Sequence, residues 1–284
     1  MMDSASARSE EGETVLFTKG HGTGNDFVLL PDPDGTLDLT PAMVAALCDR
    51  HRGIGADGVL RLVRSAKHPD AAGYAADAEW FMDYRNADGS VAEMCGNGVR
   101  VFTRYLVANG LGGTDLPIAT RAGVVRAVVH EESISVRMPS PRVYATSTAT
   151  VGSLTLPGVA VDCGNPHLVC PVPDLTGLDL RDPPGHDPAL FPHGVNVEFL
   201  APAGADLHVR MRVHERGSGE TLSCGSGALA VGAVALRDAG MESGTVTVDV
   251  PGGRLTVTRD GDDWWLAGPA VLVATGEVYE AALG

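Results

Sequence analysis

Short apolar runs separated by Gly, Pro, Asn and Asp recur along the chain, a pattern typical of a protein rich in β-strands. The predicted strands cover residues 15–17, 28–30, 59–63, 80–85, 117–120, 124–130, 134–138 and 264–268. Three helices are predicted: one over 41–47 with Thr40 as N-cap, one that follows Cys95 and ends at Asn109-Gly110, and one over 225–236. The last is apolar on every side and is therefore predicted to be buried. The segment 65–78 is predicted as a surface loop with a solvated His68.

The two halves of the chain resemble each other. Two copies of a C-G-polar-G pattern stand 129 positions apart, Cys95-Gly96-Asn97-Gly98 and Cys224-Gly225-Ser226-Gly227. Further matches follow in the same order at nearly the same spacing: Asn25 with Asn165, Gly123 with Gly253, and Pro139 with Pro269. Such matches indicate a duplicated half. We predict two copies related by a pseudo-two-fold axis, with one cleft between them.

The chemistry of the two copies depends on their cysteines. Cys95 and Cys224 each stand just before a predicted helix, and the glycines beside them leave backbone N–H groups uncovered. Each copy should therefore place a thiol and an anion-binding turn at a helix N-terminus, where aligned peptide dipoles favour the thiolate. We predict that these two are working thiols and interpret Cys48, Cys163 and Cys170 as small buried apolar residues.

Composition excludes several classes of partner. The net charge of −15 argues against nucleic acid or an anionic membrane surface. No apolar run is long enough to span a bilayer, and the polar residues 1–13 lack the apolar centre of a signal peptide, so we expect a disordered tail there. Five cysteines without C-x-x-C spacing are most simply explained as reduced thiols in a cytoplasmic protein.

Two facing thiols could form a disulfide, bind a metal or transfer protons. Zinc needs three or four ligands, which no compact Cys/His cluster supplies, and redox cysteines usually lie close together in sequence. If one thiolate removes a proton from a carbon and a thiol on the opposite face returns one, the carbon is inverted, which is the reaction of a racemase or epimerase. Lys19 and Lys67 are the only lysines, so a route through pyridoxal phosphate is disfavoured and neither cofactor nor metal is expected.

Eight motifs carry a closer resemblance. They are KGHGTGNDF at 19–27, DRHRGIGADG at 49–58, NADGS at 86–90, MCGNG at 94–98, GNPH at 164–167, NVEF at 196–199, ERGSGET at 215–221 and SCGSG at 223–227. In this order they resemble the diaminopimelate epimerase family, from about residue 17 to about residue 280. Proline racemases and phenazine-biosynthesis isomerases share the fold of that family but not this full set of motifs.

The resemblance implies an α+β fold of two pseudo-symmetric domains, each a curved, mostly antiparallel sheet wrapped around a central helix. Residues 14–140 would form the first domain and 141–270 the second, with 271–284 returning to the first. It also implies a homodimer, and the interconversion of LL- and meso-diaminopimelate without cofactor or metal, in the pathway to lysine and cell-wall precursors.

The resemblance further assigns roles position by position. Cys95 and Cys224 would be the two acid/bases, with His167 and Glu215 beside the reacting centre. Backbone N–H groups would bind the reacting carboxylate at Gly96, Asn97, Gly225 and Ser226. The rest of the substrate, mainly its distant amino-acid end, would be held by Asn25, Asn86, Asn165, Asn196 and Arg216. Asn and Arg side chains suit that end, because they offer uncharged donors and acceptors and a fork for a carboxylate. The chain departs from the family at His214, where Tyr is frequent, at Ser226, where Thr is common, and at Gly58, where some members carry a substrate-contacting Gln.

Two alternatives stay open. A racemase of another amino acid, of the proline or hydroxyproline type, would use the same two thiols but would have no use for Arg216 and several Asn side chains at a distal end. A thiol-redox or ligand-binding protein would keep the duplicated cleft without the reaction. Exchange of the substrate α-proton with solvent deuterium distinguishes these classes.

Overall fold

The computed structural model describes residues 14–204 and 207–283, and the segment expected to be a disordered tail, 1–13, lies outside them. The helices are α1 (Pro41–Cys48), α2 (Gly96–Ala108) and α3 (Gly225–Asp238), with the short 3₁₀ helices η1 (Ser65–Lys67), η2 (Ala72–Tyr74) and η3 (Glu280–Ala282). The first seven strands are β1 (Thr14–Gly22), β2 (Asn25–Pro31), β3 (Gly58–Arg64), β4 (Trp80–Asn86), β5 (Asp115–Thr120), β6 (Gly123–Val129) and β7 (Ile134–Met138). The remaining strands are β8 (Arg142–Val151), β9 (Leu154–Asp162), β10 (Pro166–Pro171), β11 (Asn196–Pro202), β12 (His208–Glu215), β13 (Gly219–Thr221), β14 (Gly244–Val250), β15 (Gly253–Asp260), β16 (Asp263–Gly268) and β17 (Val271–Tyr279).

The strands of the two halves pair in equivalent orders. The first half runs β17-β1-β2-β3-β4-β5-β6-β7, and the second runs β8-β9-β10-β11-β12-β14-β15-β16. The parallel pairs β2–β3 and β4–β5 correspond to β10–β11 and β12–β14, and the other pairs in both series are antiparallel. The halves join through an antiparallel pair of the equivalent strands β7 and β16. The predicted duplication is therefore present in the strand pairing itself.

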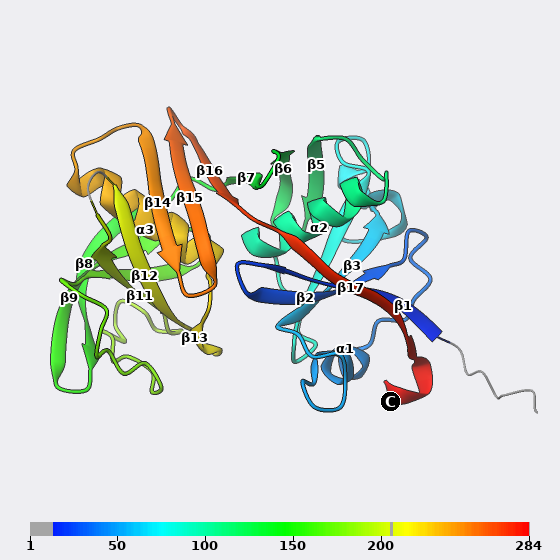
Figure 1. The fold of residues 1–284 in the computed structure, drawn as a ribbon, viewed down its shortest axis with the longest axis horizontal. Coiled ribbons are helices and arrows are strands. Elements are labelled where there is room, and N and C mark those ends of the chain that lie inside the picture. Colours follow the sequence, from blue (N-terminus) through cyan, green and yellow to red (C-terminus); the bar gives the residue numbers. More distant parts are fainter. Residues whose placement is uncertain (1–13, 205–206, 284) are drawn as a thin grey trace, which may run out of the picture.

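Each half wraps its sheet around one long helix (Figure 1), with α2 inside the first half and α3 inside the second. Helix α3 is buried along most of its length, because nearly all its residues are Ala, Val, Gly or Leu and none needs water. Helix α2 packs Val101, Phe102 and Leu106 into the same continuous core. The predicted fold class, α+β with a mostly antiparallel curved sheet around a central helix in each of two pseudo-symmetric domains, is confirmed.

The last strand crosses back over the molecule (Figure 1). β17 pairs antiparallel with β1, from Thr14 opposite Tyr279 to His21 opposite Val271. Its counterpart in the second half is β8, which pairs with β9 directly after the chain leaves the first half. The expected domain limits, 14–140 and 141–270, stay a prediction.

The expectation of a solvated His68 was wrong, although most residues of the segment 65–78 are exposed, as predicted. His68 is only 11% exposed, and its ring lies 4.7 Å from the ring of Phe81. The segment around it forms η1 and η2 and buries Ala71 and Ala78 against Phe81. The polar composition of 65–78 suggested that His68 is solvated, but Phe81 of β4 covers its ring.

Candidate active site

The two predicted working cysteines occupy equivalent places. Cys95 is the N-cap of α2 and Cys224 the N-cap of α3, both with extended backbone. The Cys95 Sγ accepts the Gly98 N–H at 3.3 Å, and the Cys224 Sγ accepts the Gly227 N–H at 3.4 Å. Each sulfur thus takes the place that a Ser or Thr oxygen commonly takes at a helix start. The prediction of a thiol at each helix N-terminus is confirmed.

The two helix N-termini touch. A Cβ added to Gly225 would lie 3.5 Å from the backbone nitrogen of Asn97, and one added to Gly96 or Gly225 would press on Leu266 at 3.2 or 3.1 Å. Asn97 also reaches across, because its Nδ2 donates to the Ser223 carbonyl at 3.2 Å. The first turns of α2 and α3 therefore lie against each other, and the N–H groups at a helix start suit an anion.

Asn25 contacts Cys95 and Asn97 at the start of α2. Its Oδ1 accepts from the Cys95 thiol at 3.7 Å and from the Asn97 amide at 3.2 Å. Its Nδ2 donates to Asp57 at 2.8 Å, and Asp57 is held in turn by Arg50 at 2.8 Å. The sequence did not reveal that Asp57 accepts a hydrogen bond from Asn25. The residue lies inside one of the eight motifs, but only the fold brings it to Asn25.

Glu215 acts on both thiols. Its Oε1 accepts from Thr221 Oγ1 at 2.5 Å, and a hydrogen bond from the Cys224 thiol helps to offset the burial that raises the pKa of this carboxyl. Its negative charge contributes to the raised pKa of Cys95 and of Cys224. On the other side of Cys224, the Ser226 Oγ lies 3.6 Å from the sulfur.

Both thiols are harder to ionise than the sequence indicated. Burial raises the pKa of Cys95 to about 11, and the N–H groups of Gly98 and Asn97 oppose this only in part. Burial also raises the pKa of Cys224, which is 5% exposed, well above its ordinary value, and the negative charges of Glu215 and Glu198 add to this rise. The expectation that the helix dipoles would make the thiolate the favoured form was wrong, since desolvation outweighs the dipoles.

His167 is held by a partner at each ring nitrogen. It is fully buried, its Nδ1 lies 2.7 Å from Glu198 Oε1, and its Nε2 lies 2.9 Å from Asn165 Oδ1. Glu198 itself packs under the first turn of α3, where a Cβ on Gly227 would lie 2.7 Å from Oε1. Burial raises the pKa of Glu198 and the charge of His167 opposes that shift. Glu198 is a second residue that sequence reasoning missed; the signal was a lone carboxylate inside the otherwise apolar strand 197–201.

Two of the residues expected at the distal end, Asn196 and Arg216, are hydrogen-bonded to each other in the second half. Asn196 Oδ1 accepts the backbone N–H of Arg216 at 2.9 Å, and the Arg216 Nη1 donates to the His193 carbonyl at 3.1 Å. Within the described ranges no carboxylate forms an ion pair with Arg216, and the residue is exposed. Asn86 stands apart: its Nδ2 donates to Ser90 Oγ at 3.0 Å inside its own turn. Across the strand pair it lies opposite Gly58.

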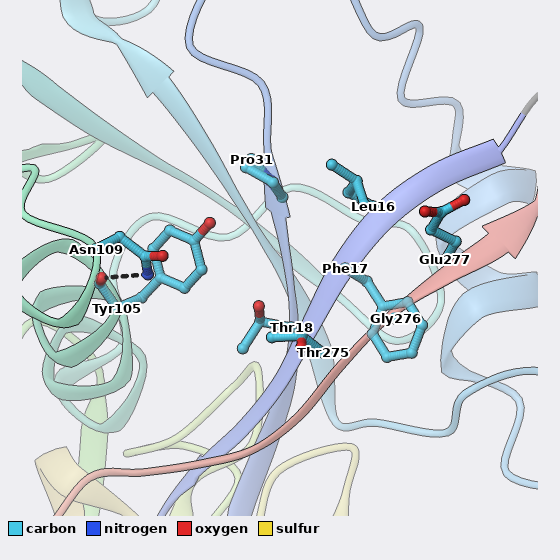
Figure 2. Close-up of a pocket in the computed structure, with 9 residues that line it drawn as sticks. All are labelled: Leu16, Phe17, Thr18, Pro31, Tyr105, Asn109, Thr275, Gly276 and Glu277. Atoms are coloured by element: carbon cyan, nitrogen blue, oxygen red, sulfur yellow. Dashed lines mark hydrogen bonds between the residues drawn. The ribbon is translucent and has the colours of Figure 1, made fainter.

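Other features of the described chain lie away from these thiols. Across residues 14–204 and 207–283, no group of three or more His, Cys, Asp and Glu side chains is arranged to hold a metal ion. Nor does any helix in those ranges have the length and apolar character to cross a membrane. A surface cavity of about 340 Å³ lies between β1, β17 and the end of α2 (Figure 2), and its lining residues, such as Leu16, Tyr105 and Glu277, include no predicted site residue. All five cysteines are free thiols.

Comparison with known proteins agrees with this arrangement. The model of the family described as diaminopimelate epimerase matches residues 17–144 and 159–280. The chain belongs to the diaminopimelate epimerase family. Members of this family are isomerases, and two of them illustrate the similarity. A diaminopimelate epimerase of Streptomyces coelicolor is 53% identical over 281 residues, covering 95% of this chain and 97% of its own. One of Rhodococcus erythropolis is 50% identical over 286 residues, covering 94% and 97%.

Solved structures related to this diaminopimelate epimerase family member share its fold at low sequence identity. A phenazine biosynthesis protein of the PhzF family from Bacillus anthracis superposes with a TM-score of 0.70 at 19% identity, covering 94% of this chain and 99% of its own. A hydroxyproline epimerase from Agrobacterium vitis superposes with a TM-score of 0.67 at 15% identity, covering 93% and 92%. At such identity the likeness shows the fold alone.

Proposed function

We propose that this chain interconverts LL- and meso-diaminopimelate without a cofactor, with Cys95 and Cys224 as the two acid/bases. The observation that carries the proposal is the pair of N-cap thiols at two helix N-termini that touch. The names of relatives at about half identity over most of the chain support the substrate, and lysine biosynthesis follows from that name.

The mechanism follows from the N–H donors at the two helix starts. A substrate α-carboxylate bound by N–H groups at Gly96, Asn97, Gly225 and Ser226 would be stabilised as negative charge develops at the α-carbon. Each well-placed donor of this kind contributes about 3 kcal/mol in the transition state. One thiolate then removes the α-proton, and the thiol opposite delivers a proton to the other face, so that the carbon inverts and the thiols exchange protonation states.

The raised thiol pKa values serve this chemistry. A thiolate whose conjugate acid has a pKa of about 11, as at Cys95, is a stronger base than an ordinary cysteine thiolate and is better matched to a weak carbon acid. The positive α-ammonium group of the substrate, bound beside Glu215 and His167, offsets the negative charge that raises both thiol pKa values. Ionisation is thereby coupled to substrate binding.

The distal residues favour diaminopimelate over a smaller amino acid. Arg216 has free donors, and its backbone is fixed to Asn196 by the 2.9 Å hydrogen bond. A second carboxylate on the substrate is the natural partner for this guanidinium. Proline and hydroxyproline have no second amino-acid end, which is the reason we rank a racemase of that type second.

Labelling in deuterium oxide tests the proposal directly. The purified chain, given LL-diaminopimelate without added cofactor or metal, should form the meso isomer with deuterium at the α-carbon. Cys95→Ala and Cys224→Ala should each lose turnover by at least about a thousandfold, since removing one member of a catalytic unit costs that order. Cys48→Ala, a buried thiol on α1, is the control and should turn over normally. Unchanged turnover in either site variant contradicts the two-base mechanism, and faster reaction with proline than with diaminopimelate contradicts the substrate.

We also propose a cytoplasmic homodimer with no nucleic-acid or membrane partner. Five free thiols suit a reducing compartment. Leu16 on β1 and Val273 and Tyr279 on β17 expose large apolar side chains on neighbouring paired strands, a surface that a second copy could cover. Sedimentation equilibrium should return twice the chain mass of 29.4 kDa, and the mass of a single chain would contradict the dimer.

A further inference from the structure

Arg100 is the largest fully buried side chain described, and it lies in the second turn of α2. Its Nη2 donates to Asn97 Oδ1 at 2.9 Å and to Thr23 Oγ1 at 3.1 Å, while its Nε and Nη1 have no hydrogen-bond partner in the structure as described. Throughout residues 14–204 and 207–283, no carboxylate forms an ion pair with it. A buried cation without a counter-ion is costly, so its presence calls for a compensating benefit.

The fold does not require this cation. Arg100 stands five positions after Cys95, and the residue five positions after Cys224 is Leu229, which is fully buried in α3 at the equivalent place. Two helices of the same construction thus use a guanidinium in one half and an isobutyl group in the other. The difference concerns the surroundings of Cys95, not the packing of a helix against its sheet.

Arg100 controls how Asn97 is oriented. Because the Asn97 oxygen accepts from Arg100, its amide nitrogen is turned toward Asn25 at 3.2 Å and Ser223 at 3.2 Å. Thr23, the other acceptor, is hydrogen-bonded to Ser223 Oγ at 2.7 Å. The guanidinium therefore organises buried polar groups from both halves, at the place where the first turns of α2 and α3 lie against each other.

We propose that Arg100 is a positioning residue for the reaction, whose unneutralised charge stabilises the Cys95 thiolate while its hydrogen bonds fix the Asn97 turn that binds the substrate carboxylate. The proposal rests on the proposed function for its catalytic part only. It makes the two thiols unequal, because the charge of Arg100 acts on Cys95 and that of Glu198 acts on Cys224, whereas Glu215 acts on both.

The titration of Cys95 supports this assignment. The titratable groups that interact electrostatically with the Cys95 thiol include Glu215 at the end of β12, Tyr84 on β4 and Arg100 on α2 itself. Glu215 raises the pKa of Cys95 and Arg100 lowers it. In the opposite direction, burial lowers the pKa of Arg100, and the charge of Cys95 works against that shift. Each of the two groups thus favours the charged form of the other.

The test measures the ionisation of Cys95 without any substrate. In a Cys224→Ala background, the rate at which neutral iodoacetamide alkylates Cys95 is followed against pH, with the modified peptide quantified by mass spectrometry. Arg100→Gln keeps a hydrogen-bond donor but removes the charge. It should raise the pH midpoint of alkylation by at least about one unit, so that the alkylation rate at a given pH below the midpoint falls about tenfold. Arg100→Lys keeps the charge and should move it by less than half as much. Arg104→Gln, one turn further along α2, is the control and should leave it in place.

Equal midpoints for wild type and Arg100→Gln would overturn the proposal. Equal shifts for Arg100→Gln and Arg100→Lys would also overturn it, because they would show that the midpoint depends on the packing of the side chain and not on its charge. If Arg100→Gln does not fold, Arg100→Met, which resembles the apolar residue of the second half, is measured in its place with the same criterion. In the chain with both thiols, Arg100→Gln should lower kcat at least tenfold and change KM less than threefold. Absence of turnover in the wild type would refute the proposed function but leave the alkylation result readable.

Discussion

At the scale of single residues, Glu198 shows how one buried carboxylate can serve a site it does not line. It is fully buried, contacts His167 at 2.7 Å and lies under the α3 turn that carries Cys224. Its second oxygen, Oε2, has no hydrogen-bond partner in the structure as described. A carboxyl group in that setting orients the imidazole beside it, as second-layer carboxylates orient metal-bound histidines.

Substitution of Glu198 by Gln should therefore impair catalysis more than stability. Gln keeps the volume but loses the charge that pairs with His167, so we expect kcat for diaminopimelate to fall roughly 10- to 100-fold, as is usual when such an orienting partner is lost. Steady-state kinetics measures the effect. Glu220→Gln in the same half, where the carboxylate pairs with Arg212 near the surface, is the matched control and should retain activity. If both variants behave alike, Glu198 has no special role.

The sequence was sufficient for the residues whose role depends on their immediate neighbours. Cys95 and Cys224 could be predicted as helix caps because a glycine-bracketed cysteine before a helix is a local pattern. Arg100 and Glu198 were not singled out, because each acquires its role from partners far along the chain, Thr23 in one case and His167 in the other. The expectation of ready thiolates failed for a related reason: the helix dipole is local, whereas burial depends on the whole fold.

At the scale of secondary-structure elements, β3 and β4 are joined by a charge cluster around Asp83. This carboxylate is fully buried and lies 2.8 Å from Arg85 Nε and 2.7 Å from Arg121 Nη2, with Arg61 and His68 further out at 3.7 and 3.8 Å. Periodicity predicted β3 and β4 correctly as strands, since each carries a run of apolar residues. It did not reveal the cluster, which needs the strands in register, Arg61 opposite Asp83.

Asp83→Asn should destabilise the first half strongly. It leaves the Arg85 guanidinium without a counter-ion, and it removes one of two carboxylates from Arg61 and Arg121, which keep Asp32 and Asp70. We expect a loss of about 3 kcal/mol in the free energy of unfolding. The paired cations lower the pKa of Asp83 below its ordinary 3.8, so its contribution is present above that value and is lost as the pH falls through the lower, folded-state pKa. Urea unfolding at neutral and acid pH measures both effects. Asp115→Asn removes an exposed ion pair with Arg126 and should change little; a comparable loss in both variants would contradict this account.

At the scale of the whole molecule, the strand order and the central helix are duplicated, whereas α1 and the buried charges are not. Under the first turn of α2, Gly98 packs on Leu60 and Phe27, whereas under α3 the equivalent Gly227 packs on Glu198, whose partner His167 takes the place of Phe27. Arg100 of the first half also corresponds to Leu229 of the second. The first half therefore carries a buried cation near its helix start, whereas the second half carries a buried carboxyl group and a histidine. A symmetric scaffold thus holds two thiols in equivalent geometry but in unequal electrostatic surroundings.

Glu215 links these two surroundings, because its negative charge contributes to the raised pKa of both thiols. Catalysis needs one thiolate and one thiol, so kcat/KM should follow a bell-shaped pH profile whose two apparent values belong to the pair. Since both thiol pKa values are raised, the ascending limb should lie on the alkaline side of an ordinary cysteine profile. Glu215→Gln removes the shared charge and should move that limb to lower pH, by up to about one unit, even though the rate itself falls. Glu220→Gln again serves as control. A limb that stays in place or moves to higher pH in Glu215→Gln would show that the two thiols do not titrate against a common carboxylate.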